Sequence, residues 1–373
     1  MRAAAFNRRT LTSAFDHVRI CTTMSTTSTE STAASPSKAF FRQPFYSQDG
    51  KTRLPQFTAH RGFNKIYPEN TLEAFQAAID VGCHGLETDV QISRDGVVVI
   101  SHDPTLIRCF GINKKINECD WEYLSTLETI REPRGKMLRL SDFLEFVSSK
   151  GRDHVWVLLD IKRNNPAKVI VKKIAETLTS GPYSSQPWNL RIVLGCWNSS
   201  YLAVCKEYLP TFQTVLIGFD VVAARKVLRT FPEVSFNLNF KSVKGPLGYG
   251  FIDAVHRNKA YKESNKGRFI YGWTFNTPRD IRWAIRKNFD AVLTDDPALF
   301  KQISDVWDDE YSKRHEKEDN KVTLRERLFL TLWGLWFVFF GWVFPLVYPY
   351  LQRFLVAKPA VKTNVKESSA STR

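Results

Sequence analysis

Short apolar segments alternate with amphipathic ones from residue 56 to residue 303, and this alternation leaves few folds open. Residues 155–159, Val-Trp-Val-Leu-Leu, form an uninterrupted apolar run that is typical of a buried strand. Residues 166–178 follow as a predicted helix, and similar pairs recur to the end of the segment. They include predicted helices at residues 70–81, with Asn70 as a plausible cap, 199–208 and 221–230, and predicted strands at residues 96–101 and 291–294. Repeated β/α units over about 250 residues favour a TIM (β/α)8 barrel. No glycine-rich dinucleotide loop follows the first strand, which disfavours a doubly wound sheet.

Two acidic residues lie on one predicted strand, residues 85–91. Successive side chains of a strand point to opposite faces, so Glu87 and Asp89 share a face at a spacing of about 7 Å. Burying two unpaired carboxylates is costly. A hard divalent cation with oxygen ligands, magnesium or calcium, would remove that cost. An acidic pair on a strand is more often a surface feature, but here histidines bracket it.

Other polar residues also fall at or near the ends of predicted strands, where barrels form their active sites. They are His60, His102, Asp160, Lys162, Trp273 and Asp295. Histidine titrates near neutral pH, so His60 and His102 suggest a proton donor and a proton acceptor, although either alone is more often structural. Arg61 and Lys162 can hold phosphate oxygens or pair with the carboxylates. Trp273 fits a wall of the substrate pocket or a core position.

Five short motifs resemble, in order, those of the glycerophosphodiester phosphodiesterase family. They are His60-Arg61-Gly62, Pro68-Glu69-Asn70-Thr71, Glu87-x-Asp89, Asp95-Gly96-Val97 and His102-Asp103. The resemblance covers about residues 56–303. It implies that Glu87, Asp89 and Asp160 hold one divalent cation, with His60 and His102 as general acid and base. The family usually has Glu-x-Lys where this chain has Asp160-Ile161-Lys162, so Asp160 is the least secure ligand.

The resemblance also implies a mechanism. One histidine deprotonates the 2-hydroxyl of a substrate glycerol, which attacks phosphorus, and the other histidine protonates the leaving alkoxide. A cyclic phosphate forms and water opens it. The substrate therefore needs a free hydroxyl next to the ester, as a glycerol headgroup provides.

The C-terminal part differs in composition from the predicted barrel. Residues 304–327 are strongly charged and predict a solvated helix or linker, and residues 352–373 a polar tail. Residues 328–351 contain no charged residue. Twenty-four residues at about 1.5 Å each could cross a hydrocarbon core of about 30 Å. We therefore expect a transmembrane or hairpin membrane anchor, with Pro345 and Pro349 permitting the hairpin. The flanking charges weakly favour a cytosolic catalytic domain.

Residues 1–45 are rich in Ser, Thr and Ala and poor in acids, which predicts a disordered leader or a targeting segment. Met24 is an alternative start to Met1. The leader and the anchor leave the mitochondrion, the endoplasmic reticulum and the lipid droplet open as locations. The six cysteines form no CxxC pair, which predicts free thiols.

The formal net charge of +15 favours an anionic partner. Zinc-finger spacings and RNA-binding motifs are missing from the sequence, so we expect a lipid bilayer and no nucleic acid. The layout of barrel and apolar tail resembles the fungal phosphatidylglycerol phospholipase C branch. It implies hydrolysis of phosphatidylglycerol to diacylglycerol and glycerol 3-phosphate. The alternatives are a glycerophosphodiester phosphodiesterase or lysophospholipase D on deacylated or lyso lipids, and a membrane-tethered binding protein on an inactive barrel.

Overall fold

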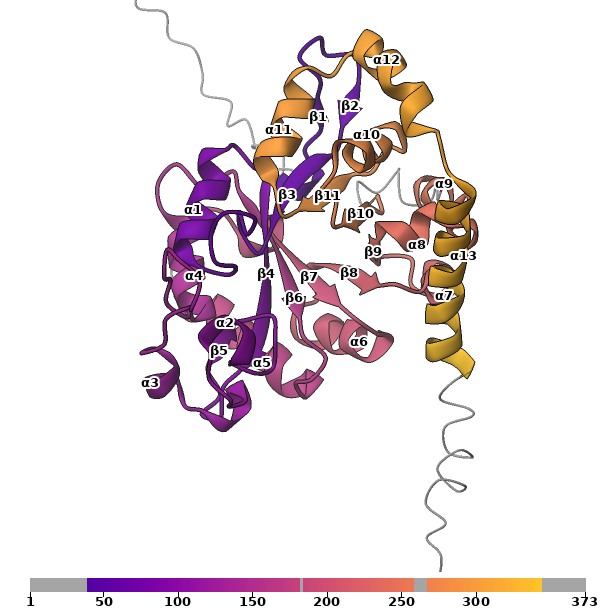
Figure 1. Cartoon of the computed structure of the whole chain (residues 1–373). Coiled ribbons are helices and arrows are strands. Elements are labelled where there is room, and N and C mark those ends of the chain that lie inside the picture. Colours follow the sequence, from indigo (N-terminus) through magenta and orange to yellow (C-terminus); the bar gives the residue numbers. More distant parts are fainter. Residues whose placement is uncertain (1–38, 182–183, 258–266, 344–373) are drawn as a thin grey trace, which may run out of the picture. The chain divides into compact units, whose positions relative to one another are not determined.

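A computed structural model describes residues 39–181, 184–257 and 267–343 of the chain (Figure 1). Most of the predicted leader, residues 344–351 of the predicted anchor and the predicted tail of residues 352–373 lie outside the described residues. Within them, eight parallel strands close into a barrel, because the first strand pairs with both the last and the second. The predicted TIM barrel is confirmed.

The barrel strands occur where the sequence has short apolar runs. In chain order they are β3 (Gln56–His60), β4 (Gly85–Ile92), β6 (Trp156–Ile161), β7 (Ile192–Cys196), β8 (Gln213–Gly218), β9 (Ser235–Asn239), β10 (Ile270–Trp273) and β11 (Ala291–Thr294). Every residue of β4 and β6 is buried, as expected for parallel strands covered by helices on the outside.

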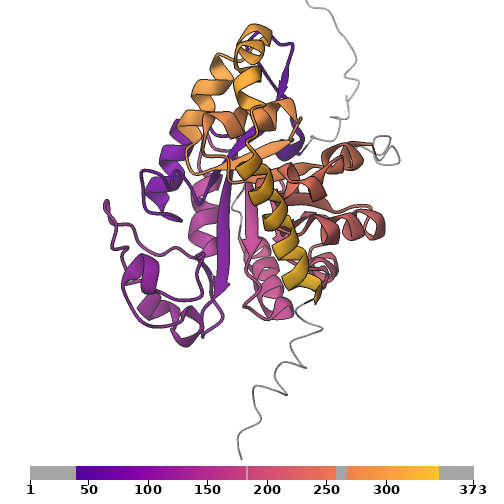
Figure 2. The same ribbon diagram turned by 45° about the vertical axis from the view of Figure 1, so that its right-hand side comes forward.

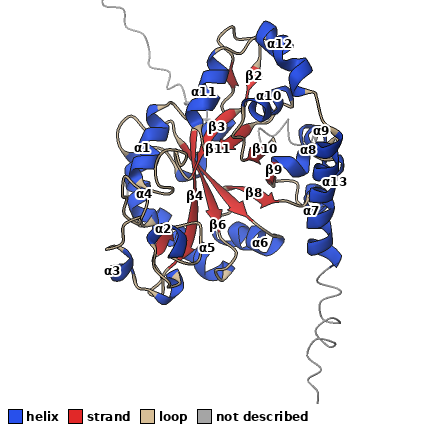
Figure 3. Ribbon diagram, in the orientation of Figure 1, coloured by secondary structure: helices blue, strands red, loops and turns tan. Residues whose placement is uncertain are grey.

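The helices surround the barrel, as Figure 3 shows in blue around the red strands. They are α1 (Leu72–Asp80), α2 (Ile107–Phe110), α3 (Trp121–Leu124), α4 (Leu140–Ser148), α5 (Ala167–Thr179), α6 (Ser199–Tyr208), α7 (Val221–Thr230), α8 (Phe240–Lys244), α9 (Phe251–His256), α10 (Pro278–Arg286), α11 (Pro297–Asp305), α12 (Asp309–Asp319) and α13 (Leu324–Val338). Three of them begin one or a few residues after a strand, where Asn198, Asp220 and Thr277 accept hydrogen bonds from the first turn.

The amino ends of the strands are closed by the segment that precedes the barrel. The short 3-10 helix η1 (Phe40–Arg42) packs there, with the Phe41 ring against Trp156 and Phe269. A small antiparallel pair follows, β1 (Phe45–Tyr46) with β2 (Arg53–Leu54). Three further 3-10 turns in the described part of the chain are η2 (Ile116–Glu118), η3 (Trp188–Leu190) and η4 (Pro246–Gly248). With this end closed, the carboxyl ends of the strands are left for ligands.

One predicted strand is not part of the barrel. The segment after Gly96 forms β5 (Val98–Ile100), which pairs antiparallel with β4 at its far end. The interpretation of residues 96–101 as a barrel strand ending at His102 is therefore wrong, and His102 lies on the loop that follows an antiparallel hairpin. The five described cysteines are free thiols, as predicted.

The predicted membrane anchor is corrected by the structure. Among the described residues no helix combines the length and apolar composition that crossing a bilayer requires. Helix α13 has 15 residues, about 22 Å at 1.5 Å per residue, against a hydrocarbon core of about 30 Å. The π-helical turn η6 (Phe339–Val343) follows it. The expected membrane-anchored localisation, which depended on that span, is overturned by this finding.

Candidate active site at the carboxyl ends of the strands

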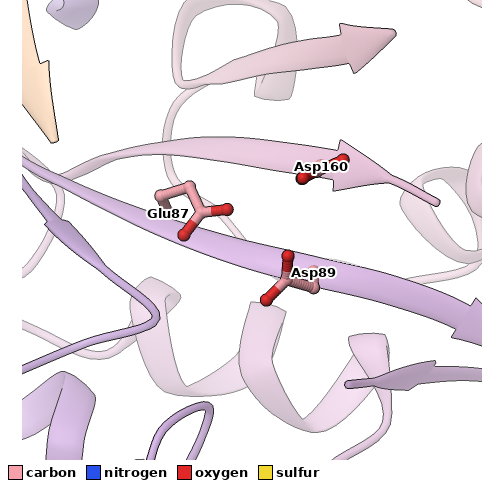
Figure 4. A group of neighbouring side chains, drawn as sticks. All are labelled: Glu87, Asp89 and Asp160. Carbon is pink, nitrogen blue, oxygen red and sulfur yellow. The ribbon is translucent and has the colours of Figure 1, made fainter. Parts of the chain in front are cut away.

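Three carboxylates from two neighbouring strands lie together, as Figure 4 shows. Glu87 and Asp89 come from β4 and Asp160 from β6, and the strand register places Asp89 directly opposite Asp160. One oxygen from each lies within 4.8 Å of the others, and all three residues are buried. Burial first, and then the charges of Asp89 and Asp160, hold the pKa of Glu87 well above its usual value. Such a cluster fits a hard divalent cation, which offsets the repulsion.

The adjacent strand pairing also answers the question of side-chain length at Asp160. Because β6 is hydrogen-bonded to β4, the shorter aspartate still reaches the other two carboxylates. Its Oδ1 accepts a hydrogen bond of 2.7 Å from the indole Nε1 of Trp197, the first residue after β7. Trp197 was not among the predicted site residues, although its position after a strand was a usable signal.

Two cations lie against the carboxylates. Lys162 Nζ is 2.7 Å from Asp89 Oδ1 and 2.6 Å from Asp160 Oδ2. Arg61 Nε is 3.2 Å from Asp89 Oδ2, and the Arg61 backbone N–H donates to Glu87 Oε2 at 2.9 Å. Burial alone would raise the pKa of Asp89, but Lys162 and Arg61 together hold it far below its usual range. The predicted ion pairs therefore exist, and both cations stay next to the site.

Each of the two histidines is paired with an aspartate. His60 Nδ1 is 2.6 Å from Asp295 Oδ1, and His102 Nδ1 is 2.6 Å from Asp103 Oδ1. With Nδ1 engaged in this way, Nε2 of each ring is left for proton exchange. His60 Nε2 lies 4.0 Å from Glu87 Oε2, next to the acidic cluster. Burial lowers the pKa of His102, against the opposing attraction of Asp89.

The aspartate partner of His60 is itself held by two amides. Asp295 accepts a hydrogen bond from Asn64 Nδ2 at 2.9 Å and one from Asn276 Nδ2 at 2.5 Å. Burial alone would raise the pKa of Asp295, but the hydrogen bond and charge of His60, with the two amides, lower it to about 2. The carboxylate is thus ionised and fixed beside the ring of His60.

A second network links the partner of His102 to Arg61. Arg108 donates to Asp103 at 2.7 Å and makes two bonds to Glu69, at 2.6 and 2.8 Å. Glu69 in turn accepts a bond of 3.1 Å from Arg61. Glu69 belongs to one of the five sequence motifs but had no predicted role, and Arg108 was not among the predicted site residues because it follows no strand.

Asn70 has a different place from the one expected. It was predicted to cap the helix of residues 70–81, but the N-cap of α1 is Thr71, whose side chain accepts from the Ala74 N–H. Asn70 has a φ of 60° and donates from Nδ2 to Asp89 Oδ2 at 2.9 Å. The sequence signal for a cap was correct to one residue, and the tertiary contact with Asp89 explains why Asn70 is not the cap.

A cavity of about 1150 Å³ opens from this cluster. Its polar end is lined by His60, Glu87, His102, Asp160 and Lys162, so the structure brings these predicted residues together. Trp273 also lines the cavity, and its Nε1 donates to the backbone oxygen of Asn237 at 3.2 Å. The side-chain Oδ1 of Asn237 is buried and has no hydrogen-bond partner among the described residues.

Comparison with known proteins agrees with this geometry. Residues 60–299 match the glycerophosphoryl diester phosphodiesterase family. Lysophospholipase D GDPD1 of Homo sapiens is 33% identical over 278 residues, which cover 67% of this chain and 86% of that protein. The glycerophosphodiester phosphodiesterase of Thermotoga maritima is 25% identical with a TM-score of 0.51, over 67% of this chain and 98% of that one.

A third relative has been solved with its product. The Oleispira antarctica phosphodiesterase in complex with sn-glycerol-3-phosphate is 20% identical with a TM-score of 0.53, over 67% of this chain and 96% of that one. At 20% identity, the similarity to this structure supports only the fold of the chain. The match of the family to most of the chain decides the assignment: this chain belongs to the glycerophosphoryl diester phosphodiesterase family.

Proposed function

We propose that this protein is a metal-dependent phosphodiesterase that hydrolyses glycerophosphodiesters and lysophospholipids with a free hydroxyl next to the phosphate ester. The observation that carries the proposal is the buried cluster of Glu87, Asp89 and Asp160 beside two histidine–aspartate pairs. The name of the human relative, a lysophospholipase D, supports the lyso-lipid substrate. Hydrolysis of phosphatidylglycerol, with diacylglycerol as the leaving group, stays a prediction, and this reaction would use the same chemistry.

Glu87, Asp89 and Asp160 would hold the divalent cation, which when bound supplies Lewis-acid polarisation of a phosphate oxygen. Arg61 and Lys162 add fixed positive charge where negative charge redistributes during the reaction. Both are held by hydrogen bonds or ion pairs, so they need little reorganisation. Charges fixed in advance in a partly buried site stabilise a transition state more than mobile ones in water.

The histidines supply the proton transfers. One imidazole takes the proton of the substrate hydroxyl as its oxygen attacks phosphorus, and the bond from phosphorus to the headgroup oxygen breaks. The other imidazolium gives its proton to that leaving oxygen, which departs as an alcohol. Water then opens the cyclic phosphate with the two roles reversed, leaving glycerol phosphate or its acylated form. Asp295 and Asp103 fix the tautomers that these transfers need.

Product analysis tests the proposal directly. Purified protein would be given glycerophosphocholine, 1-acyl lysophosphatidylcholine and phosphatidylglycerol vesicles in turn, with magnesium or calcium and with chelator. We expect chelator-sensitive release of choline from the first two, abolished by Glu87→Gln. Glu176→Gln is the matched control, because that residue forms an exposed ion pair with Lys173 on α5.

Two outcomes would change the assignment. Diacylglycerol from phosphatidylglycerol alone would replace our substrate by the phospholipase C alternative. Tight binding of glycerophosphodiesters without any metal-dependent turnover would favour a binding protein on an inactive barrel.

A further inference from the structure

Helix α13 lies beyond residue 299, where the family match ends, yet it is built into the barrel. Figures 1 and 2 show it, in yellow, running beside α7 and α8. Its first turn is tied down by Glu326, which pairs with Lys244 at 3.2 Å and Arg279 at 3.1 Å. Further along, Trp333 Nε1 donates to Ser242 Oγ at 3.1 Å. These contacts fix the side of α13 that faces the barrel.

Close backbone approach supports the same conclusion. A Cβ on Gly245 would lie 3.0 Å from the Leu330 carbonyl oxygen, so only glycine permits this packing without a shift. Leu330 and Gly334 are buried, and together with Trp333 and Phe337 they repeat at helical spacing along one face. This face of α13 therefore has a defined partner surface.

Aromatic rings connect this helix to the acidic cluster. Trp197, which donates to Asp160, is 6.2 Å from the ring of Trp273. Trp273 is 4.9 Å from Phe219, the first residue after β8, and Phe219 stacks on Phe337 of α13 at 4.4 Å and 7°. The four rings, Trp197, Trp273, Phe219 and Phe337, form what we call the aromatic wall.

The aromatic wall borders a cavity that is larger than the headgroup chemistry requires. The volume of about 1150 Å³ exceeds the 300–1,000 Å³ typical of pockets for drug-sized ligands, and glycerol phosphate is smaller than those ligands. Away from the acidic cluster, the lining comes from α7 with its flanking residues and from the α13–η6 segment. It includes the apolar Val227, Phe231, Phe337 and Phe340, and also the polar Asp220, Lys226 and Thr230. The apolar part thus begins at the site of reaction and ends on α13.

We propose that α13 completes a site for one hydrocarbon chain of the substrate, with Phe337 as a specificity-determining residue. The inference rests on the proposed function and narrows it, since the enzyme then prefers a glycerophosphodiester that keeps an acyl chain over the deacylated compound. The physical reason is that a chain leaves water when it lies against the aromatic wall, while glycerophosphocholine has nothing to bury there. Because one cavity extends from His60 and His102 to α13, a hydrocarbon chain can bind in it while it remains covalently attached to a phosphate group at the histidines.

The test compares two substrates on one pair of variants. Phe337→Ala removes a ring from the aromatic wall, and Leu332→Ala trims an exposed leucine on the outer side of the same helix. Kinetics would be measured with glycerophosphocholine and with 1-acyl lysophosphatidylcholine below its micelle concentration. We expect Phe337→Ala to lower kcat/KM for the acylated substrate about tenfold through KM, the size typical of a lost contact in an apolar pocket. Leu332→Ala should leave the turnover of both substrates unchanged, and the loss in Phe337→Ala should be much larger for the acylated substrate than for glycerophosphocholine.

A second variant keeps the proposal testable if Phe337→Ala folds poorly. Ala223→Phe adds volume inside the cavity on α7 and should shorten the longest acyl chain that is accepted. Equal losses on both substrates, or no loss on either, would refute the chain site while leaving the phosphodiesterase in place. Absence of metal-dependent turnover of both substrates by the unmodified protein would instead refute the proposed function.

Discussion

The pairing of His60 with Asp295 gives the sharpest prediction for the reaction. Asp295 accepts three side-chain hydrogen bonds, from His60 and Asn64 at Oδ1 and from Asn276 at Oδ2. In Asp295→Asn only one side-chain oxygen remains. The new amide N–H₂ must therefore face either the donors of His60 and Asn64 or the donor of Asn276. Whichever way the amide turns, His60 loses the negative charge beside its Nδ1, and with the N–H₂ turned toward the ring it also loses the acceptor that fixes its tautomer. Because positioned acid–base catalysis contributes about 10²–10⁴-fold, we expect kcat to fall by that order.

The same substitution should lower stability in a pH-dependent way. The pKa of Asp295 drops from the usual 3.8 to about 2, which corresponds to about 2 kcal/mol of interaction with the ionised carboxylate. A depressed folded pKa contributes stability above the unfolded value of 3.8, and that contribution is lost as the pH falls through about 2. The difference in unfolding free energy between the two proteins should therefore be near its maximum at neutral pH and shrink below pH 3.8.

Steady-state kinetics and urea unfolding of the same preparations would measure both effects. Asp290→Asn is the matched control, because Asp290 accepts from Arg53 at 2.8 Å and pairs with His256 at 3.0 Å just before β11 begins, at the opposite end from Asp295. It should lose stability without a comparable loss of kcat. A kcat of Asp295→Asn within threefold of the unmodified protein, or an equal loss in Asp290→Asn, would refute the reasoning.

Three further predictions concern the metal, the pH profile and the cavity. Magnesium or calcium at a hundredfold excess over Kd should stabilise the metal-free protein by about 2.7 kcal/mol in thermal unfolding, and an equal shift in Glu87→Gln would contradict the site. With metal saturating and His102 as the base, the acid limb of kcat/KM should lie below pH 6.5, since burial lowers the pKa of His102, and a limb above 6.5 would count against His102 in that role. Asn237→Ala should raise KM for glycerophosphocholine about tenfold, because a substrate hydroxyl would lose the buried Oδ1 as acceptor, and an unchanged KM would exclude that contact.

The barrel could be predicted because its units are short and clearly bounded. Helices α6 and α7 begin and end at the residues expected from the sequence, and so does strand β11. Asn198 and Asp220 mark the two helix starts with side-chain hydrogen bonds. The helix boundaries are predictable because the apolar periodicity and the capping residues both indicate the same first residue of each helix.

The errors arose where a local pattern had two meanings. Asp95-Gly96 precedes the apolar run of β5, and such a pair is a strong hairpin signal, which fits the φ of 84° at Gly96. The run was nevertheless interpreted as another parallel strand. In the C-terminal segment, apolar composition without charge indicated lipid, whereas Leu330 and Gly334 of α13 are buried on the barrel. Hydropathy measures the preference for leaving water and does not identify what covers the side chain.

The two histidines show what sequence reasoning can and cannot find in the site. The partner of His102 is the next residue, Asp103, so one motif contains both members of the pair. The partner of His60 is 235 positions away, and it reaches the ring only because β11 returns to pair with β3 and closes the barrel. The catalytic competence of His60 therefore depends on that seam between first and last strands. Substitutions that weaken the pairing of β3 with β11 should therefore lower activity by displacing His60 from Asp295. They should do so before they disturb the acidic cluster, which lies on the separate β4–β6 pair.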